Sequence, residues 1–329
     1  MAVSCRRLLR LSPMTWAKHL ANFSSHPGEM LTIKEVRQNL MENVGVRTKW
    51  GKENPWQEPN LMQPVVESQS QLPRRKPSDS LVRARIPLTD PEAREKYLLF
   101  NGGIRFGRLL EDFDTLAEQS TSSEQSLSGQ KDIYIQGNVT WVGKSSMECS
   151  MFMEQEVDGV VHKFLSAKYL FAARNPLNNK AGIINPLDPQ TPEEKAAFKL
   201  GEENKKLRTQ EGSKSLLKTP PTESERLIIH DIFLSTVNQD SGSLRVRLKP
   251  ENTVWMEDTI LKSLIICHPE QRNLYNKIFG GFLMRGAYEL AWITASVYSK
   301  KRPGMCKVVD DILFMKPVEI GSLLFLSSQ

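Results

Sequence analysis

Residues 273–289, NLYNKIFGGFLMRGAYE, have the composition of a loop that turns into a helix at a glycine pair. Gly280 and Gly281 carry no Cβ, so a ligand carbonyl can approach the backbone amides closely at this point. The dipole of the helix that follows favours negative charge at its start. The pattern therefore predicts a place where the oxyanion of an acyl-transfer reaction is stabilised. The alternative is that the two glycines only let the helix pack closely beneath a sheet.

The segments around this turn have the order expected of a sheet that surrounds one central helix. A β-rich run, residues 252–267, precedes the loop, and two strand-like runs, residues 306–321 and 323–326, follow the helix. Large apolar residues recur near helical spacing in the helix: Phe282, Leu283, Leu290 and Ile293. Small residues make a second strip along it: Ala287, Ala291 and Ala295. We expect the helix to be buried along this alanine strip.

At this loop the chain resembles the hotdog-fold acyl-CoA thioesterases, whose motif reads approximately N-x-x-G-x-x-F/H-G-G ahead of the central helix. Asn273, Phe279, Gly280 and Gly281 match the motif, while Asn276 replaces its middle glycine. The resemblance implies an α+β fold in which antiparallel sheets wrap around helices. It also implies hydrolysis of acyl-CoA to a free fatty acid and CoA by attack of water. No metal is implied, and no cofactor besides the CoA of the substrate.

A second copy of the loop-and-helix unit lies earlier in the chain. Residues 105–117, RFGRLLEDFDTLA, read as a glycine turn that leads into a helix, and the shift that places Gly107 on Gly281 aligns the two units. We call this offset the repeat shift. A strand is expected before the first unit, over residues 79–88, and residues 131–174 read as strands joined by tight turns. Both halves therefore have the order strand, turn, helix and sheet, which together with the resemblance predicts a tandem double hotdog.

The helix of the thioesterase family often reads R-L-L-E-W-M-D-E and carries a catalytic aspartate. Residues 108–114, RLLEDFD, match this pattern, so the resemblance implies that Asp114 is the catalytic carboxylate. The second copy has Tyr288 at that position, and the loop residue Asn273 is replaced by Leu99 in the first copy. This complementarity predicts one composite site, with Asp114 from the first hotdog and Asn273 from the second. The alternatives are an exposed helix carboxylate for Asp114 and a turn residue for Asn273.

Further candidates for substrate binding lie in the same two units. Gly280 and Gly281, with Gly107 in the first copy, are the expected donors to the substrate oxyanion. Arg272 and Lys277 are candidate contacts for the phosphates of CoA, with solvated charge as the alternative.

Other chemistry-bearing residues are weaker candidates. His268 precedes a proline in the loop and can be read as a general base, although most such histidines are turn residues. Cys267 has no evident activating partner, so a Cys–His nucleophile is disfavoured. The four cysteines are far apart without C-x-x-C spacing, which indicates reduced thiols rather than a metal site or disulfides. His162 and His230 read as structural residues.

The chain divides into five expected segments. These are a leader over residues 1–28, an accessory helix and linker over 29–78, a first hotdog over 79–175, a polar connection with helices over 176–235 and a second hotdog over 236–329. Helices are expected over residues 31–44, 192–209 and 224–234, the second with its charges towards solvent and the third able to pack on the following domain. After Ala117 the first helix gives way to a polar run, so residues 118–130 are expected to be irregular and exposed. The second hotdog stops at Gln329 without the further strands of the family, which indicates a shortened form.

Composition limits the classes of partner and compartment. The net charge is +6, but positive residues gather in the leader and in a proline-flanked linker rather than on one folded face, so no nucleic-acid partner is predicted. No run approaches the roughly 20 apolar residues of a spanning helix, so no membrane span is expected. Residues 1–28 contain arginines and leucines but no Asp or Glu, which is typical of a mitochondrial transit peptide. We therefore expect a mitochondrial protein, in the matrix or associated with the inner membrane, whose residues before about Ser25 are removed or disordered. A disordered basic tail is the alternative.

Three functions are compatible with these residues. The first is an acyl-CoA thioesterase, which needs a donor pair and an activated water or a carboxylate nucleophile. The second is an acyl-thioester hydratase, which requires an active-site histidine with an acid, and His268 is the only candidate close to the loop. The third is a catalytically inactive or binding-only isoform that lacks parts of both hotdogs. The resemblance favours the first and implies a homo-oligomer, because folds of this kind commonly associate.

Overall fold

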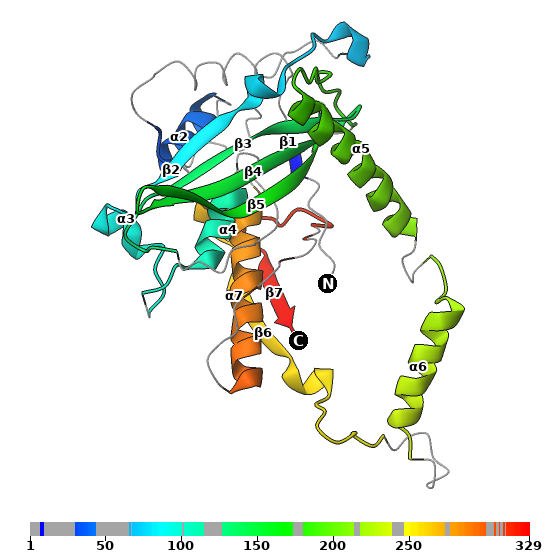
Figure 1. Cartoon of the computed structure of the whole chain (residues 1–329). Helices are drawn as coiled ribbons and strands as arrows, with labels where there is room; N and C mark the ends of the chain where they lie inside the picture. The colour runs from blue at the N-terminus through cyan, green and yellow to red at the C-terminus, as the bar shows by residue number, and fades with distance from the viewer. Residues whose placement is uncertain are drawn as a thin grey trace.

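The computed structural model of the 329-residue chain describes residues 7–9, 30–43, 66, 68–100, 102–114, 127–173, 180–213, 218–238, 247–273, 277–300, 306, 309, 312 and 314–329. These residues form two α+β units, one above the other in Figure 1. The upper unit is built on a five-stranded sheet, and the lower unit combines a two-stranded sheet with a long helix. The expected α+β class with antiparallel sheets is confirmed.

The larger sheet has the strand order β1-β5-β4-β3-β2. Its strands are β1 (Arg7–Leu9), β2 (Val82–Ile86), β3 (Ile133–Val142), β4 (Ser146–Val157) and β5 (Val160–Ala173). All neighbours are antiparallel except β1, which is parallel to β5. Alternate residues of β3 are buried, as expected of a strand with one face on a core. The turn between β4 and β5 is made by Asp158 and Gly159, both with positive φ (54° and 78°), as the sequence predicts.

The core of this unit lies between the sheet and two helices, α2 (Ile33–Asn43) and α4 (Phe106–Asp114). α2 occurs where the sequence predicts a helix. It begins at a capping box, in which the Glu35 amide donates to the Thr32 hydroxyl and the Thr32 amide donates to the Glu35 carboxylate. One turn later Val36 is fully buried in the core. Burial of an aliphatic side chain of this size contributes roughly 1.5–3 kcal/mol.

The polar run after α4 differs in part from its expected state. Residues 118–126 lie outside the described residues. Leu127 packs against the core, and the Ser128 backbone makes two hydrogen bonds with the Gln155 side chain (2.9 and 2.8 Å). The expectation of an exposed run is therefore wrong at its C-terminal end, because the buried Gln155 amide needs hydrogen-bond partners.

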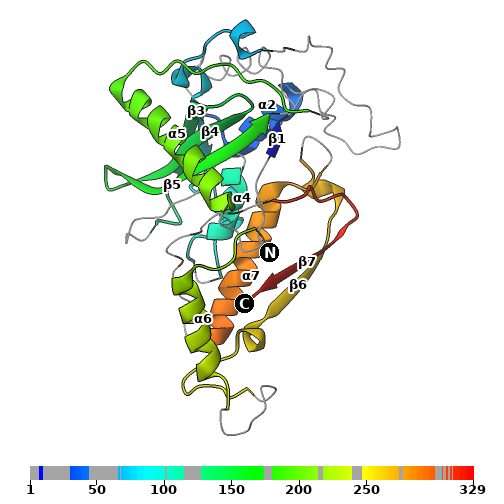
Figure 2. The same cartoon turned by 90° about the vertical axis from the view of Figure 1, so that its right-hand side faces the viewer.

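A further helix, α5 (Pro192–Ser213), lies across the face of the sheet that points away from α4 (Figures 1 and 2). A β-bulge between Val139 and Trp141 changes the face on which the following side chains lie. Trp141 is therefore buried against α5, at a position where the helix has Gly201. A Cβ on Gly201 would lie only 2.3 Å from the Trp141 Cβ, so this contact requires a glycine.

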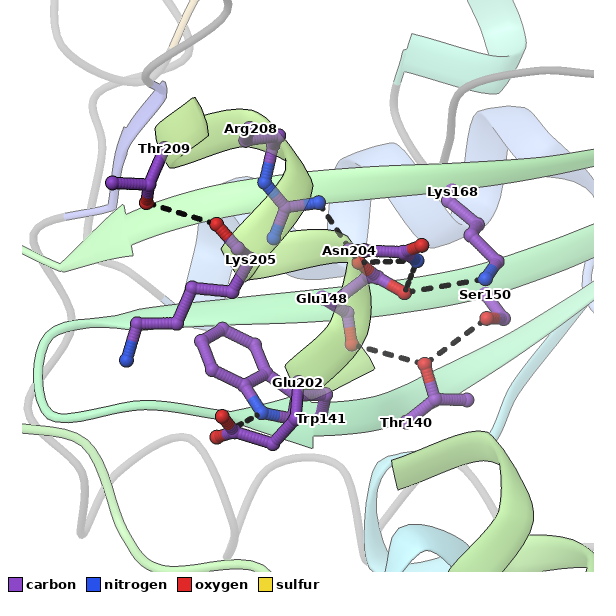
Figure 3. A network of polar contacts seen from close by, with 10 residues as sticks. All are labelled: Thr140, Trp141, Glu148, Ser150, Lys168, Glu202, Asn204, Lys205, Arg208 and Thr209. Carbon is purple, nitrogen blue, oxygen red and sulfur yellow. Dashed lines mark hydrogen bonds and ion pairs between the residues drawn. The ribbon is translucent and has the colours of Figure 1, made fainter. Parts of the chain in front are cut away.

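Figure 3 shows the polar contacts that fasten α5 to the sheet. The buried Glu148 carboxylate of β4 accepts hydrogen bonds from Asn204 (3.2 Å) and Arg208 (3.1 Å), and Lys168 of β5 lies 3.5 Å away. A buried carboxylate is tolerated only with such partners. The expectation that the charges of α5 face solvent is therefore wrong on this side of the helix.

The smaller unit consists of β6 (Leu261–Ile266), β7 (Leu323–Ser328) and α7 (Gly280–Ser299). β6 and β7 are antiparallel, and α7 packs on one face of this pair. The contact is close at Gly286, where a Cβ would lie 3.1 Å from the Leu326 side chain. Residues 306–321, expected as strands, are described only in part, and Glu319 among them forms a single bridge with the Asn273 loop.

The buried side of α7 is not its alanine strip. All three alanines are exposed: Ala287, Ala291 and Ala295. The buried residues are Gly281, Leu283, Met284, Leu290 and Thr294. The prediction of a buried alanine strip is wrong, because leucine and methionine side chains remove more apolar surface from water than alanine methyl groups do.

The helix α6 (Glu223–Ser235) begins at a capping box between Thr222 and Glu225, close to the predicted start. Its apolar side chains are exposed, among them Ile228 and Ile232, so the expected packing on the following unit is not seen. Within the described ranges, no helix is long and apolar enough to cross a membrane. The same residues contain no group of three or more side chains placed to hold a metal ion.

Candidate active site

The loop before α7 is closed by its own hydrogen bonds. The Asn273 backbone amide donates to the Lys277 carbonyl (2.6 Å), and the Lys277 amide donates to the Asn273 side-chain oxygen (3.1 Å). The Phe279 amide donates to the Gln271 carbonyl (2.7 Å) and brings the two ends of the loop together. Asn273 is half-buried. In an asparagine side chain the NH2 group is the donor, so a hydrogen bond that Asn273 donates to a ligand would come from that group.

α7 begins at Gly280, directly after this loop. Phe279 precedes the helix in an extended conformation and has no polar side-chain group to cap it. The Leu283 amide donates to the Phe279 carbonyl (3.3 Å) and closes the first turn. The amides before Leu283, including those of Gly280 and Gly281, point out of the helix start without an intrahelical acceptor. This arrangement can stabilise negative charge on an oxygen placed there.

The first unit contains the same loop. The Leu99 amide donates to the Gly103 carbonyl (2.7 Å), and the Arg105 amide donates to the Tyr97 carbonyl (2.7 Å). When the two units are aligned by the repeat shift, these two bonds correspond to the Asn273–Lys277 and Phe279–Gln271 bonds of the second unit. The first residue of α4 then corresponds to the first residue of α7. The internal repeat of loop and helix, predicted from the sequence, is therefore present in the structure.

α4 and α7 cross as antiparallel neighbours. In order along α4, the contacts are Arg105 with Glu289 (2.7 Å), Phe106 with Tyr288 (ring centroids 5.2 Å apart) and Glu111 with Arg285 (2.6 Å). Each step forward along α4 is thus a step backward along α7. Gly107 lies in this crossing, where a Cβ would be 3.3 Å from the side chains of Arg285 and Glu289. Its missing side chain allows the helices to approach each other.

Asp114, the predicted carboxylate, is the last residue of α4, and its side chain lies outside the described part of the chain. Two other carboxylates of the helix, Glu111 and Asp112, are buried, and both meet Arg108 (2.7 and 3.4 Å). Burial by itself would lower the pKa of Arg108, but Asp112 and Glu111 outweigh burial and raise it. These two carboxylates are engaged in ion pairs, and the assignment of catalysis to Asp114 stays a prediction.

Three other ionisable side chains near the loop, Glu289 together with the weaker candidates His268 and Cys267, are less suitably placed for catalysis. Glu289 forms an ion pair with Arg105. His268 is exposed and lies just before a short turn of 3-10 helix, Pro269–Gln271. Burial raises the pKa of the Cys267 thiol, so the neutral, weakly nucleophilic form is favoured. This result agrees with the argument against a Cys–His nucleophile.

The two candidate phosphate contacts both take part in the loop. The Lys277 ammonium pairs with Glu319 (2.6 Å). Arg272 donates from its guanidinium to the Pro269 carbonyl (2.9 Å). They lie on either side of Asn273, close to the start of α7.

The residues that hold α4 in place, both against α7 and within its own unit, were not predicted from the sequence. Arg285 meets Glu111, and on the other side of α4 the Tyr97 hydroxyl donates to Asp112 (2.5 Å). Burial and then the Asp112 charge raise the pKa of Tyr97, so its hydroxyl stays protonated and donates. The sequence does contain one signal for the pair of Glu111 and Arg285. The two residues carry opposite charges and occupy equivalent positions in the two repeats.

An uncapped helix start with two glycines, a loop asparagine beside it and a carboxylate-bearing helix against it define a site suited to acyl transfer. No protein-family model matches the chain. The chain is 45% identical over 325 residues to human acyl-coenzyme A thioesterase 9, mitochondrial, with 90% of this chain and 74% of the relative covered. It is 43% identical over 330 residues to mouse acyl-coenzyme A thioesterase 10, mitochondrial, with 92% and 75% covered. The chain belongs to the acyl-CoA thioesterase family and is an acyl-CoA thioester hydrolase.

Solved structures show a weaker likeness. The crystal structure of an acyl-CoA hydrolase from Bacillus cereus is 19% identical and covers 45% of this chain and 99% of its own, with a TM-score of 0.35. The crystal structure of an apo-hexameric acyl-CoA thioesterase is 17% identical, with a TM-score of 0.37 and 44% of this chain covered.

Proposed function

We propose that the chain hydrolyses acyl-CoA at one composite site, to which the first unit contributes Asp114 and the second contributes Asn273, Gly280 and Gly281. The two units are then the halves of a tandem double hotdog over residues 79–175 and 236–329. The repeated loop and helix, whose hydrogen bonds coincide under the repeat shift, support this architecture. The remaining segments are the linkers and the leader.

The register of the helix crossing is the observation that carries this proposal. The Phe106 ring packs against the Tyr288 ring. In the repeat alignment, Phe106 of the first unit corresponds to Gly280 of the second, and Tyr288 of the second corresponds to Asp114 of the first. The contact equivalent to Phe106–Tyr288 is therefore one between Gly280 and Asp114. Continuing the antiparallel register from Glu111 and Arg285 leads to the same ends of the two helices. This register supports the proposal that the end of α4 lies opposite the start of α7.

The proposed reaction uses the two sides of this crossing. The amides of Gly280 and Gly281 bind the thioester oxygen, and the Asn273 NH2 group orients the attacking water. Asp114 takes a proton from the water while the water oxygen forms a bond to the carbonyl carbon. The C–S bond of the tetrahedral intermediate then breaks, and the CoA thiolate receives the proton from Asp114. The products are a free fatty acid and CoA.

The equivalent position at the other end of the crossing is unsuited to this chemistry. Phe106 stands where the working site has Gly280, and Leu99 stands where it has Asn273. Tyr288 replaces the carboxylate, and burial followed by the Cys306 charge raises its pKa to about 12, so it is not a base at neutral pH. We therefore propose one working site per chain.

The proposal extends to the binding of CoA and to the assembly of the chain. Arg272 and Lys277 are proposed to contact the CoA phosphates, which requires Lys277 to exchange Glu319 for phosphate. A homo-oligomer is proposed because the outer face of β6 and β7 exposes apolar side chains, including Leu264 and Phe325.

A mitochondrial location is proposed from the basic leader and from the mitochondrial relatives. Fusing residues 1–28 to a fluorescent reporter tests it. The reporter is expected in mitochondria, and a diffuse cytosolic signal would exclude this location.

Steady-state hydrolysis tests the composite site. Asp114→Asn and Asn273→Ala should each lower kcat by roughly 10²-fold or more, while the melting temperature stays nearly unchanged. The double variant should be little worse than the worse single variant, because both groups act on one water. Near-normal turnover of Asp114→Asn would remove the carboxylate assignment.

A further inference from the structure

Two residues of opposite charge meet at the centre of the crossing between α4 and α7. The Arg285 guanidinium lies 2.6 Å from the Glu111 carboxylate. The repeat shift places Glu111 on Arg285, so the two positions are equivalent in the two repeats. A contact between equivalent positions lies at the approximate twofold axis that relates the repeats. Identical repeats would place two like charges there, whereas this chain has a cation on one helix and an anion on the other.

This pair is largely enclosed. The side chains of Glu111 and Arg285 are only 10% and 23% exposed. The same Glu111 oxygen is 2.7 Å from Arg108 of its own helix, and the Arg285 guanidinium lies 5.4 Å from the centre of the Phe282 ring. Both groups are thus oriented by a second partner. An ion pair of this kind contributes more to a defined geometry than to net stability, because desolvation offsets much of its attraction.

The pair is close to both halves of the proposed site. Glu111 is three residues before Asp114 on α4, which is about one helical turn. Arg285 is four residues after Gly281 on α7, again about one helical turn. A slip of one residue along a helix moves a side chain by about 1.5 Å along the axis and by about 100° around it. Displacements of about 1 Å can cost a factor of about 10² in rate.

We propose that Arg285 and Glu111 are positioning residues for the thioesterase reaction, fixing the register of the two helices so that Asp114 faces the start of α7. This inference rests on the proposed composite site. Neither residue needs to touch the substrate. The pair acts through the placement of Asp114, and this makes a prediction that a purely structural role does not make.

Arg285→Gln is the informative variant, because Glu111 keeps Arg108 as a partner and no buried carboxylate is left unpaired. It should lower kcat about tenfold or more and change KM by less than about twofold. Arg285→Lys keeps the positive charge but loses the planar guanidinium group. Its kcat should lie between the kcat of wild type and that of Arg285→Gln. This variant also carries the test if Arg285→Gln fails to fold.

The matched control is the ion pair between Arg85 and Asp132, which has a similar length (2.9 Å) and similar exposure (35% and 10%) but lies away from the crossing. Asp132 keeps the Thr89 backbone and hydroxyl as donors when Arg85 is replaced. Arg85→Gln should lower the melting temperature about as much as Arg285→Gln does. Its kcat should remain within about twofold of wild type.

The deciding measurement is the effect of Arg285→Gln in the Asp114→Asn background of the full chain. If the pair acts through Asp114, the loss in kcat should shrink from about tenfold to less than about twofold, because non-additivity reports a shared step. An equal loss in both backgrounds, or an unchanged kcat for Arg285→Gln, would overturn the inference. Failure of the composite site itself has a different signature, namely normal turnover of Asp114→Asn alone.

Discussion

Replacing Gly107 by alanine tests whether the spacing of α4 and α7 controls the activity. The new Cβ would lie 3.3 Å from the Cγ atoms of Arg285 and Glu289. Carbon atoms in contact prefer about 3.5–4.0 Å, so one helix has to move by a few tenths of an ångström. Overpacking of this kind costs about 1–3 kcal/mol, and the better helix propensity of alanine offsets up to about 1 kcal/mol of that cost. The free energy of unfolding should therefore fall by about 0–3 kcal/mol.

The loss of activity should be larger than this loss of stability suggests. Moving α7 against α4 displaces the glycine amides from Asp114, so we expect kcat to fall about tenfold. A spectrophotometric assay of the CoA thiol released from acyl-CoA gives kcat, and urea unfolding gives the stability. Both are measured well below the unfolding midpoint, so that unfolded chain does not contribute to the change in rate.

Gly286→Ala is the matched control. Its Cβ would meet the end of the Leu326 side chain at 3.1 Å, on the sheet side of α7 rather than in the crossing. A flexible side-chain end can move aside, so the helix should gain up to about 1 kcal/mol in stability and keep its kcat within about twofold. Equal kcat for Gly107→Ala and wild type, or equal losses for the two variants, would refute the reasoning about helix spacing.

Two further predictions concern the larger unit. Burial raises the pKa of Asp132, but hydrogen bonds from Thr89 and the Arg85 partner outweigh it and lower the pKa below its usual value of 3.8. A lowered folded-state pKa stabilises the fold above the unfolded value and loses that effect as pH falls through the folded value. The urea midpoint of Asp132→Asn should thus lie below wild type at pH 7 and approach it below pH 3.8, and a difference independent of pH would contradict this. Gly201→Ala should destabilise the chain by about 1–3 kcal/mol in thermal unfolding, because its Cβ would overlap Trp141, whereas an unchanged melting temperature would show that α5 does not pack as described.

The parts of the fold that could be predicted are those fixed by neighbours in sequence. The alternation of β3 and the turn at Asp158 and Gly159 are local signals, and they placed the sheet correctly. The repeat of loop and helix was readable because the glycines at 107 and 281 mark the same turn. The helices expected over residues 31–44 and 224–234 were also placed close to their observed bounds, Ile33–Asn43 and Glu223–Ser235.

The contacts that could not be predicted join distant segments. Nothing near Glu148 in the sequence indicates that Arg208 will meet it, so the charges of α5 were assigned to solvent. The buried side of α7 depends on which face meets the sheet and α4, and local composition favoured the alanines over Leu283 and Leu290. For the site, the sequence motif located the loop of Asn273. The ion pair between Glu111 and Arg285 could not be predicted without knowing that α4 packs against α7.

The central claim is that residue 114 of the first unit lies at the acyl-CoA site built by the second. Alkylation of Asp114→Cys with iodoacetamide tests this location without relying on catalysis. The native thiols Cys149 and Cys267 are buried, and burial raises their pKa, so they should react slowly. Cys5 and Cys306 are replaced by serine. Asp158→Cys, on the exposed β4–β5 turn, serves as the control site.

The measurement compares alkylation rates with and without a non-hydrolysable acyl-CoA thioether. At a ligand concentration of about 100 Kd, the account predicts that the thiol at position 114 is protected by up to roughly 100-fold, while the thiol at position 158 reacts at an unchanged rate. Equal alkylation rates at position 114 with and without the thioether would contradict the composite site.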